Sequence, residues 1–142
     1  MKILVVGANG FLGRHIVSKT LEKKWSVHCV YNKNKNNIPK KCKVFTLNEV
    51  LNTENSYDII FLVASRIPYY NNVQMDKLII SNLELPLKIS RKYKHSKIVF
   101  SSSVSVYGSH KEPISENSNH NNPSVYGLSK LAGEFALGFN NN

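Results

Sequence analysis

Residues 1–14 read MKILVVGANGFLGR, and their order indicates how the rest of the chain folds. Residues 3–6 are continuously apolar and mostly β-branched, which is typical of a strand buried on both faces in a parallel sheet. A turn with three glycines follows, and from Phe11 onwards apolar residues recur at helical spacing. A strand, a glycine turn and a helix in this order are typical of the start of a dinucleotide site.

The three glycines fit such a site, although they are spaced unusually. Gly7 allows a sharp turn at the strand end, Gly10 allows the backbone to approach a pyrophosphate, and Gly13 allows the helix to pack on the strand. The helix N-terminus offers N–H groups and a positive dipole end to phosphates. The spacing Gly-x-x-Gly-x-x-Gly is one residue longer in its first gap than the Rossmann fingerprint, and it can also form an ordinary tight turn.

Length and composition indicate one ordinary globular domain. The 142 residues, 42% hydrophobic and 20% charged, are enough for one domain with a core but not for two. Nineteen Lys and Arg against nine Asp and Glu give a net charge of +10, which can mark a nucleic-acid partner. The positive residues are scattered along the whole chain, so we expect no nucleic-acid partner and keep a basic nucleic-acid-binding protein as the third alternative.

The cysteines and histidines predict no metal site. Two cysteines do not make a disulfide framework, and the five histidines are dispersed without metal-ligand spacing. No segment approaches the roughly 18 apolar residues of a membrane span, and the N-terminal apolar run is too short for a secretion signal. We therefore expect a cytoplasmic protein without membrane contact.

Apolar runs alternate with helical patterns along the chain. Strands are predicted at residues 3–6, 25–31, 43–47, 58–64 and 97–102. Helices are predicted at 11–24, 73–94 with a kink at Pro86, and 125–139, and Asn48 could cap a brief helix through Leu51. Residues 104–123 are predicted to be a long polar loop.

This alternation predicts an α/β fold, a Rossmann-type doubly wound parallel sheet of about five strands in the order 3-2-1-4-5. The ligand crevice should lie at the C-terminal strand ends between strands 1 and 4. Ala64, Ser65 and residues 101–103 fall at those ends. The serines could hydrogen-bond a substrate oxygen, or they could simply be a polar strand end that leads into a loop.

Tyr126 and Lys130 form a candidate acid/base pair. Residues four apart on a helix share a face, and a lysine cation favours the phenolate form of a neighbouring tyrosine. Such a pair could take a proton from an alcohol while the alcohol carbon gives hydride to a nicotinamide. The same spacing occurs four times in this lysine-rich chain, and the other three are Tyr31/Lys35, Tyr93/Lys97 and Tyr107/Lys111. Context favours Tyr126, because this pair alone opens a predicted helix.

Three motifs together resemble a known family. They are GANGFLG at residues 7–13, SSS at 101–103 running into VYG at 106–108, and YGLSK at 126–130. They resemble the extended short-chain dehydrogenase/reductase family, the NAD(P)-dependent sugar-nucleotide epimerases and dehydratases. The motifs occur in family order with family-like spacing and cover nearly the whole chain.

The resemblance implies roles for individual residues. It implies Ser103 as the hydroxyl that positions the substrate, Tyr126 as the acid/base, and Lys130 as its partner and a ligand of the nicotinamide ribose. It also implies Asn82 as a structural residue beside the active site. The cofactor-binding residues are expected to be Gly7, Asn9, Gly10, Phe11, Leu12, Gly13, Arg14, Asn32, Lys33, Ala64, Ser65, Asn82, Tyr126 and Lys130.

The sequence departs from the family pattern after the second predicted strand. Members that prefer NAD place an acidic residue there, whereas this chain has Tyr31, Asn32 and Lys33. The missing carboxylate and the cations Arg14, Lys33 and Lys35 suit a 2′-phosphate, so NADP is favoured over NAD. Alternatively, the two lysines belong to a solvated loop.

The second departure concerns the end of the chain. Family enzymes continue with further strands and a C-terminal domain that binds the sugar nucleotide, so we expect residues 1–142 to be the NAD(P)-binding domain with the substrate domain absent. The leading hypothesis is the cofactor-binding and catalytic-residue portion of such an enzyme, which acts on a nucleotide sugar if a further domain completes it. The alternative is a non-catalytic NAD(P)-binding sensor or partner subunit. The fifth strand would have an open edge that pairs readily with another chain, so we expect a homo-oligomer.

Overall fold

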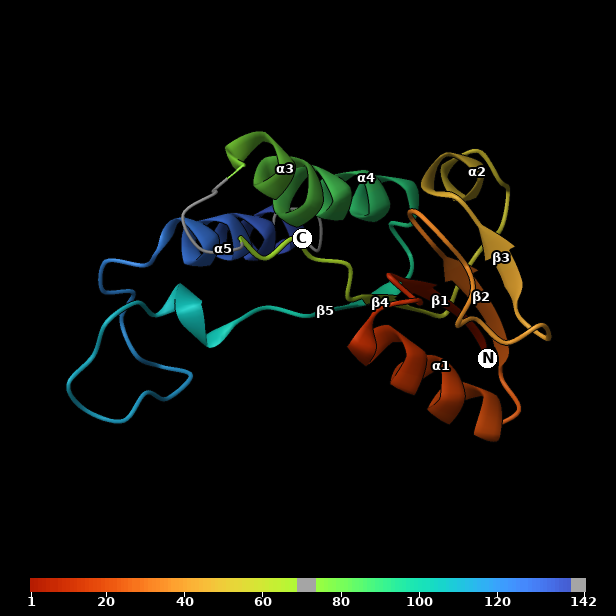
Figure 1. Ribbon diagram of the computed structural model, residues 1–142, viewed down its shortest axis with the longest axis horizontal. Coiled ribbons are helices and arrows are strands. Elements are labelled where there is room, and N and C mark those ends of the chain that lie inside the picture. The colour runs from red at the N-terminus through yellow and green to blue at the C-terminus, as the bar shows by residue number, and fades with distance from the viewer. Residues whose placement is uncertain (69–73, 139–142) are drawn as a thin grey trace. The chain divides into compact units, whose positions relative to one another are not determined.

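The computed structural model in Figure 1 describes residues 1–68 and 74–138. The chain divides into two compact units. Unit 1 comprises Met1–Ala64 and Lys88–Ser101, and unit 2 comprises Ser65–Leu87 and the described residues from Ser102 onwards. The predicted helix start at Val73 and the predicted helix end at Phe139 lie outside the described residues. The single domain predicted over residues 1–142 stays a prediction.

Unit 1 contains a five-stranded parallel sheet in the order β3-β2-β1-β4-β5, as the sequence predicted. Its strands are β1 (Lys2–Val6), β2 (Ser26–Val30), β3 (Lys43–Phe45), β4 (Ile59–Leu62) and β5 (Lys97–Phe100). β1 lies at the centre and is hydrogen-bonded to β2 on one side and to β4 on the other. Residues 3–6 are at most 2% exposed, as expected for a strand covered on both faces.

Helix α1 (Phe11–Glu22) lies along one face of this sheet (Figure 1). Its buried residues are Gly13, Val17 and Thr20. Val17 belongs to a core that also contains Ile3, Val5, Val27 and Cys29. The helix ends two residues earlier than predicted, because Lys24 adopts a left-handed conformation with φ of 58°.

Figure 1 shows α2 (Leu47–Leu51) and the unit 1 part of α4 (Leu85–Lys92) on the side of the sheet away from α1. The prediction that Asn48 caps α2 was wrong. Thr46 is the cap, since its hydroxyl accepts the Glu49 N–H (3.3 Å) and the Glu49 carboxylate accepts the Thr46 N–H (2.6 Å). Such a capping box needs an acid three residues after the cap, which Thr46 has and Asn48 lacks.

Unit 2 consists of helical segments and the chain that connects them. The predicted helix from residue 73 is α3 (Met75–Ile79), a π-helical turn η1 (Ile80–Glu84) and the start of α4. The helix therefore changes from α to π geometry in the turn before Pro86, where a kink at Pro86 was predicted. Proline has no N–H to donate to the carbonyl of Asn82, four residues earlier, and the wider turn accommodates this missing hydrogen bond. The last helix, α5 (Val125–Gly138), agrees with the prediction.

The predicted polar loop 104–123 is more ordered than its sequence suggests. It begins with a short 3-10 helix, η2 (Val104–Val106), and Gly108 then pairs with Asn121 in an isolated bridge. The Ser109 N–H donates to the Asn121 carbonyl (2.9 Å), and the Asn121 N–H donates to the Tyr107 carbonyl (2.8 Å). The loop is thus closed at its base shortly before α5 begins.

Candidate functional site

The glycine turn between β1 and α1 is held by backbone contacts in unit 1. The N–H groups of Gly7 and Ala8 donate to the Val30 carbonyl at the end of β2 (3.1 and 3.2 Å). Gly7 has φ of 94°, and a Cβ there would lie 2.6 Å from the Ala64 nitrogen. A Cβ at Gly13 would lie 2.1 Å from the Gly7 carbonyl oxygen. Ala64, predicted to contact the cofactor, therefore packs against the turn itself.

The N-terminus of α1 is open towards an anion. Gly10 occupies the N-cap position and provides no side-chain hydrogen bond, and the first turn contains no acidic residue. The first backbone hydrogen bond of the helix runs from Arg14 N–H to the Gly10 carbonyl (3.0 Å). The N–H groups of Phe11, Leu12 and Gly13 are therefore left for a ligand, at the positive end of the helix dipole.

Asn9 connects the glycine turn to the loop after β2. Its Nδ2 donates to Asn34 Oδ1 (2.5 Å), and its Oδ1 accepts the Asn37 N–H (3.3 Å). Sequence reasoning missed both partners, because they lie in a run of asparagines and lysines without periodicity. The loop that carries Asn32 and Lys33 is thereby held beside the turn.

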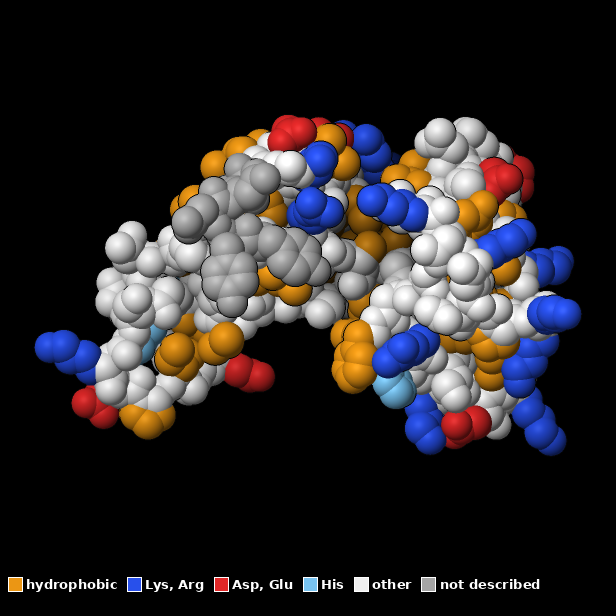
Figure 2. Space-filling model, in the orientation of Figure 1, with side chains coloured by type: hydrophobic (Ala, Val, Ile, Leu, Met, Phe, Trp, Pro, Cys, Tyr) orange, Lys and Arg blue, Asp and Glu red, His pale blue; other side chains and the backbone are white. Residues whose placement is uncertain are grey.

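The three cations predicted to favour a 2′-phosphate are all exposed on unit 1. The guanidinium of Arg14 lies over the Phe11 ring, 5.1 Å from its centroid. Hydrogen bonds from Thr46 and, to a smaller extent, the charge of Lys35 lower the pKa of the Glu49 carboxyl. Lys35 thus faces a carboxylate as well as solvent. On the face drawn in Figure 2 the Lys and Arg side chains are scattered and do not form one patch.

In unit 2 the start of α5 carries the candidate acid/base pair. The Ser124 hydroxyl accepts the Gly127 N–H (3.2 Å) and caps the helix. Gly127 is buried against the Ser105 carbonyl, so α5 packs on η2 at this point. Ser103 directly precedes η2 and caps it by accepting the Ser105 N–H (3.2 Å). Unit 2 therefore brings Ser103 to the first turn of α5, where Tyr126 lies.

Lys130 lies one turn after Tyr126 on the same face of α5. Its side chain is buried, with 1% of the residue exposed, and the ammonium group thus loses most of its hydration. Burial lowers the pKa of Lys130 to about 8, against the opposing effect of the Glu134 carboxylate. Tyr126 is half-buried one turn earlier on the same helix.

The other three Tyr/Lys pairs lack this arrangement. Tyr31 follows β2, and Tyr107 follows η2 and leads into the loop. Tyr93 is buried at the end of α4, where its hydroxyl donates to the Val50 carbonyl (2.6 Å). Tyr126 and Lys130 are therefore the one pair of the four that shares a helix face.

Asn82, on the π-helical turn η1, ties the parts of unit 2 together. Its Oδ1 accepts from the Ser65 hydroxyl and the Arg66 N–H (both 3.1 Å). Its Nδ2 donates to the Arg66 carbonyl (3.1 Å) and the Ser129 hydroxyl (2.9 Å), and that hydroxyl donates to the Tyr126 carbonyl (2.7 Å). The amide has no hydrogen-bonding capacity left, so this geometry favours the structural role expected of Asn82 over direct cofactor binding. The Ser65 hydroxyl is likewise engaged inside unit 2.

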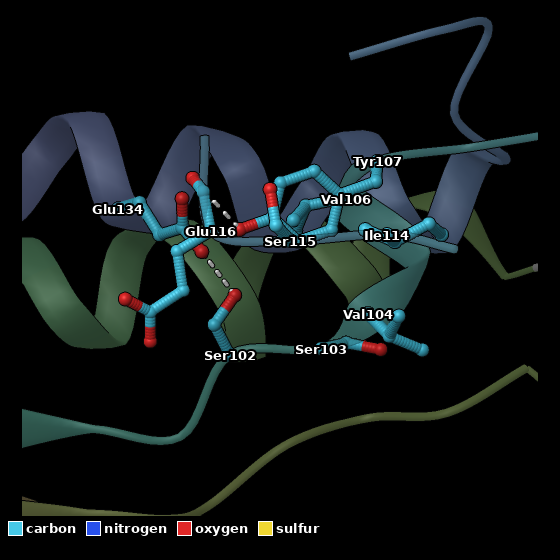
Figure 3. Close-up of a pocket in the computed structure, with 9 residues that line it drawn as sticks. All are labelled: Ser102, Ser103, Val104, Val106, Tyr107, Ile114, Ser115, Glu116 and Glu134. Atoms are coloured by element: carbon cyan, nitrogen blue, oxygen red, sulfur yellow. Dashed lines mark hydrogen bonds between the residues drawn. The ribbon is translucent and has the colours of Figure 1, made fainter. Parts of the chain in front are cut away.

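A pocket of about 520 Å³ lies beside Ser103 in unit 2 (Figure 3). Its walls come from the end of the β5 segment, η2, the loop and α5, and its lining residues are Ser102, Ser103, Val104, Val106, Tyr107, Ile114, Ser115, Glu116 and Glu134. The Ser102 hydroxyl donates to Glu134 across this wall. Hydroxyls and carboxylates around a small hollow suit a polyhydroxylated ligand. Sequence reasoning missed Glu134, although its position one turn after Lys130 was a usable signal.

Comparison with known proteins agrees with this geometry. The model of the NAD dependent epimerase/dehydratase family matches residues 3–137 of the chain. The chain belongs to this family. The match includes the glycine turn, the strand-end serines and the Tyr126–Lys130 helix, so the resemblance inferred from the motifs is confirmed.

Two curated members of the family are similar in sequence. The chain is 36% identical to the "Putative UDP-glucose 4-epimerase" of Methanocaldococcus jannaschii, over 93% of this chain and 48% of that protein. It is 32% identical to an uncharacterized UDP-glucose epimerase of Bacillus subtilis, over 94% of this chain and 50% of that protein. The chain thus spans about half the length of the curated epimerases that it matches.

Solved structures of the family share the fold. The UDP-glucuronic acid 4-epimerase from Bacillus cereus in complex with NAD has a TM-score of 0.81 at 23% identity, over 99% of this chain and 52% of that one. The UDP-Glc/GlcNAc 4-epimerase from Campylobacter jejuni has a TM-score of 0.86 at 23% identity, over 98% of this chain and 48% of that one. Both likenesses confirm the Rossmann-type sheet.

The residues of unit 1 fit the dinucleotide that the epimerase/dehydratase family binds. Gly7 and Gly13 leave no room for side chains, and α1 begins without a side-chain cap or an acidic residue. A pyrophosphate needs a close approach to backbone N–H groups of this kind. Within the described residues no three His, Cys, Asp or Glu side chains are grouped so that they could hold a metal ion. No helix in the described ranges is long and apolar enough to cross a membrane.

Proposed function

We propose that this chain is the dinucleotide-binding and acid/base part of an enzyme that epimerises or dehydrates a nucleotide sugar. The observation that carries the proposal is the α5 face on which Tyr126 lies one turn from the buried Lys130, with Ser103 held at the same helix start. Family membership supports the nucleotide-sugar substrate class, and the UDP-glucose epimerases among the relatives make UDP-hexoses the first substrates to test.

Each residue of the proposed centre has a defined task. Tyr126 takes the proton from a sugar hydroxyl and later returns it at the same oxygen. The Lys130 ammonium stabilises negative charge on the phenolate oxygen and contacts the nicotinamide ribose. Ser103 accepts the Ser105 N–H and can still donate its own hydrogen to a sugar oxygen. When bound, the dinucleotide supplies a reversible hydride acceptor at the carbon that carries the reacting hydroxyl.

We further propose that NADP is favoured over NAD. No carboxylate follows β2 to hold the adenine ribose hydroxyls, and Arg14, Lys33 and Lys35 are exposed on the same unit as the glycine turn. Asn9 holds the loop of Lys33 beside that turn. Cytoplasmic location and homo-oligomerisation are parts of the same proposal.

The experiment that tests the proposal is turnover of a sugar-nucleotide panel by the wild type and by Tyr126→Phe. Phenylalanine keeps the ring and removes the oxygen that transfers the proton. We expect at least about a 100-fold loss of turnover, the usual contribution of a positioned acid or base. Dinucleotide affinity should stay within about twofold, since the ring packing is unchanged. Undiminished turnover would remove Tyr126 from the mechanism.

The second candidate function is a non-catalytic NAD(P)-binding sensor or partner subunit. It is favoured by the glycine turn and the uncapped start of α1, which suit dinucleotide binding whether or not a reaction follows. The same panel distinguishes the two candidates. Dinucleotide binding without turnover of any sugar nucleotide would support this candidate over the first.

A further inference from the structure

Helix α5 carries a third polar residue on the face of Tyr126 and Lys130. Glu134 lies one turn after Lys130, so the three side chains follow one another at the spacing of neighbours on a helix. Glu134 is half-buried and lines the pocket beside Ser103 (Figure 3). The mechanism above assigns it no task.

A contact from outside the helix holds the Glu134 side chain. The Ser102 hydroxyl donates to the Glu134 carboxylate, and 32 residues of sequence separate the two. Ser102 directly precedes Ser103, so this hydrogen bond connects the serine segment with α5. Figure 3 shows Ser102 and Glu134 pointing towards each other. A carboxylate fixed in this way keeps its negative charge at a defined place on the α5 face.

That charge acts on Lys130. Burial disfavours the ammonium form of Lys130, and the Glu134 carboxylate opposes this effect and raises the pKa of the lysine. The other titratable side chains on elements that pack against α5 include Asp76 and Lys77 on α3 and Glu84 on η1. They stay unchanged in the experiment below.

We propose that Glu134 is a positioning residue that ties the Ser102–Ser103 segment to the helix of the acid/base pair and places a negative charge one turn after Lys130. The inference rests on the function proposed for Tyr126 and Lys130 and extends it by one residue. In its absence a smaller fraction of Lys130 would be protonated at neutral pH. The positive charge proposed to act beside Tyr126 would then be reduced.

The test measures the ionisation of Lys130 itself. Heteronuclear NMR of the chain labelled with ¹³Cε-lysine follows the lysine signals from pH 6 to 11, and loss of one signal in Lys130→Met assigns Lys130. Glu134→Gln keeps the size of the side chain and removes its charge. We expect the pKa of Lys130 to fall from about 8 by about one unit. At pH 7.5 this is about a threefold loss of the protonated form.

Glu116→Gln is the matched control. Glu116 is exposed and lines the same pocket, but it lies on the loop and not on α5. Its substitution by glutamine makes the same change of charge and shape as Glu134→Gln. We expect the pKa of Lys130 to stay within about 0.2 units in this variant. An equal fall in both variants would show that general pocket charge acts on Lys130, which would overturn the specific role of Glu134.

Ser102→Ala is the second test and decides the matter should Glu134→Gln fail to fold. It keeps both charges and removes the hydrogen bond that holds the carboxylate, so we expect a smaller fall in the pKa of Lys130. An unchanged pKa in the folded variants would overturn the inference. The titration needs neither cofactor nor substrate. A negative result in the Lys130 titration therefore does not affect the turnover test of Tyr126. A negative turnover test likewise does not affect the titration.

Discussion

The proposed preference for NADP depends on single side chains of unit 1. Arg14 lies one turn into α1, and Lys33 lies on the loop that Asn9 holds. On the proposed function, a 2′-phosphate near either side chain would meet a positive charge, and no carboxylate follows the end of β2. The ribose hydroxyls of NADH would find no acidic acceptor in the same place.

We therefore expect tighter binding of NADPH than of NADH in fluorescence titrations. Arg14→Ala should reduce the NADPH advantage about threefold, as expected for one exposed charge contact. The advantage should shrink as salt rises, because exposed charges are screened. Lys23→Ala removes the same charge at the other end of α1 and serves as the control. Equal affinities for the two cofactors in the wild type would refute the preference.

His28 is a buried base with consequences for stability. It is 3% exposed, and its Nδ1 lies 3.0 Å from the Tyr57 hydroxyl. Burial first, and then the charges of Lys2 and Lys43, lower the pKa of His28 to about 4. An unfolded histidine binds its proton near pH 6.5. The folded state is therefore fully favoured above about pH 6.5, and this stability is lost as the pH falls towards 4.

Urea unfolding at pH 7.5 and pH 5.0 measures this effect. We expect the free energy of unfolding to fall by about 2 kcal/mol more in the wild type than in His28→Gln. His95→Gln removes an exposed histidine instead, so its pH dependence should match that of the wild type. The same pH dependence in all three proteins would mean that His28 titrates normally in the folded state.

At the scale of elements, Asn82 determines how α5 is held in unit 2. Asn82→Ala removes four hydrogen bonds of a fully buried amide and leaves the partly buried Arg66 backbone groups without these partners. Leaving buried polar groups unpaired costs about 1–3 kcal/mol each. We expect a loss of about 2–4 kcal/mol in the free energy of unfolding, measured in urea. Asn48→Ala, at an exposed asparagine of α2, should cost less than about 0.5 kcal/mol.

The elements show which features the sequence could predict. Continuous apolar runs and the glycine turn predicted the strand order, because buried parallel strands and long crossovers leave few alternatives. The π-helical turn was not predicted. Pro86 cannot donate a hydrogen bond to the residue four positions earlier, and apolar spacing alone does not indicate whether the helix kinks or widens there. Thr46 lies within the predicted strand 43–47, so the apolar pattern did not indicate that it caps a helix. The Asn9–Asn34 and Ser102–Glu134 contacts join distant residues, and no local pattern reports them.

At the scale of the whole molecule, strand β5 lies at an edge of the sheet in unit 1. Among the described residues β4 is the one strand that pairs with β5 (Lys97–Phe100), and Val99 is 40% exposed. Lys97 is the one charge on this strand. Such an edge pairs readily with the edge of another chain.

We expect the 142-residue chain to self-associate, so that light scattering after size exclusion gives a mass above 16.1 kDa. Val99→Lys places a second charge on the edge and should shift the chain towards the monomer. Val104→Lys makes the same substitution at an apolar residue that is 67% exposed outside the sheet. It should leave the mass unchanged. A monomeric wild type, or an equal effect of both variants, would exclude association through this edge.

The bridge between Gly108 and Asn121 closes a loop, residues 109–120, that can be replaced as a unit. The backbone hydrogen bonds at the base of the loop are made by Tyr107, Ser109 and Asn121, and nearly all residues between them are exposed. Loops of this kind tolerate changes of length, because closing a longer loop costs little extra entropy. The loop contributes Ile114, Ser115 and Glu116 to the pocket but none of the proposed acid/base residues. Recombination or engineering can thus change the lining of the pocket and leave the Tyr126–Lys130 face of α5 unchanged.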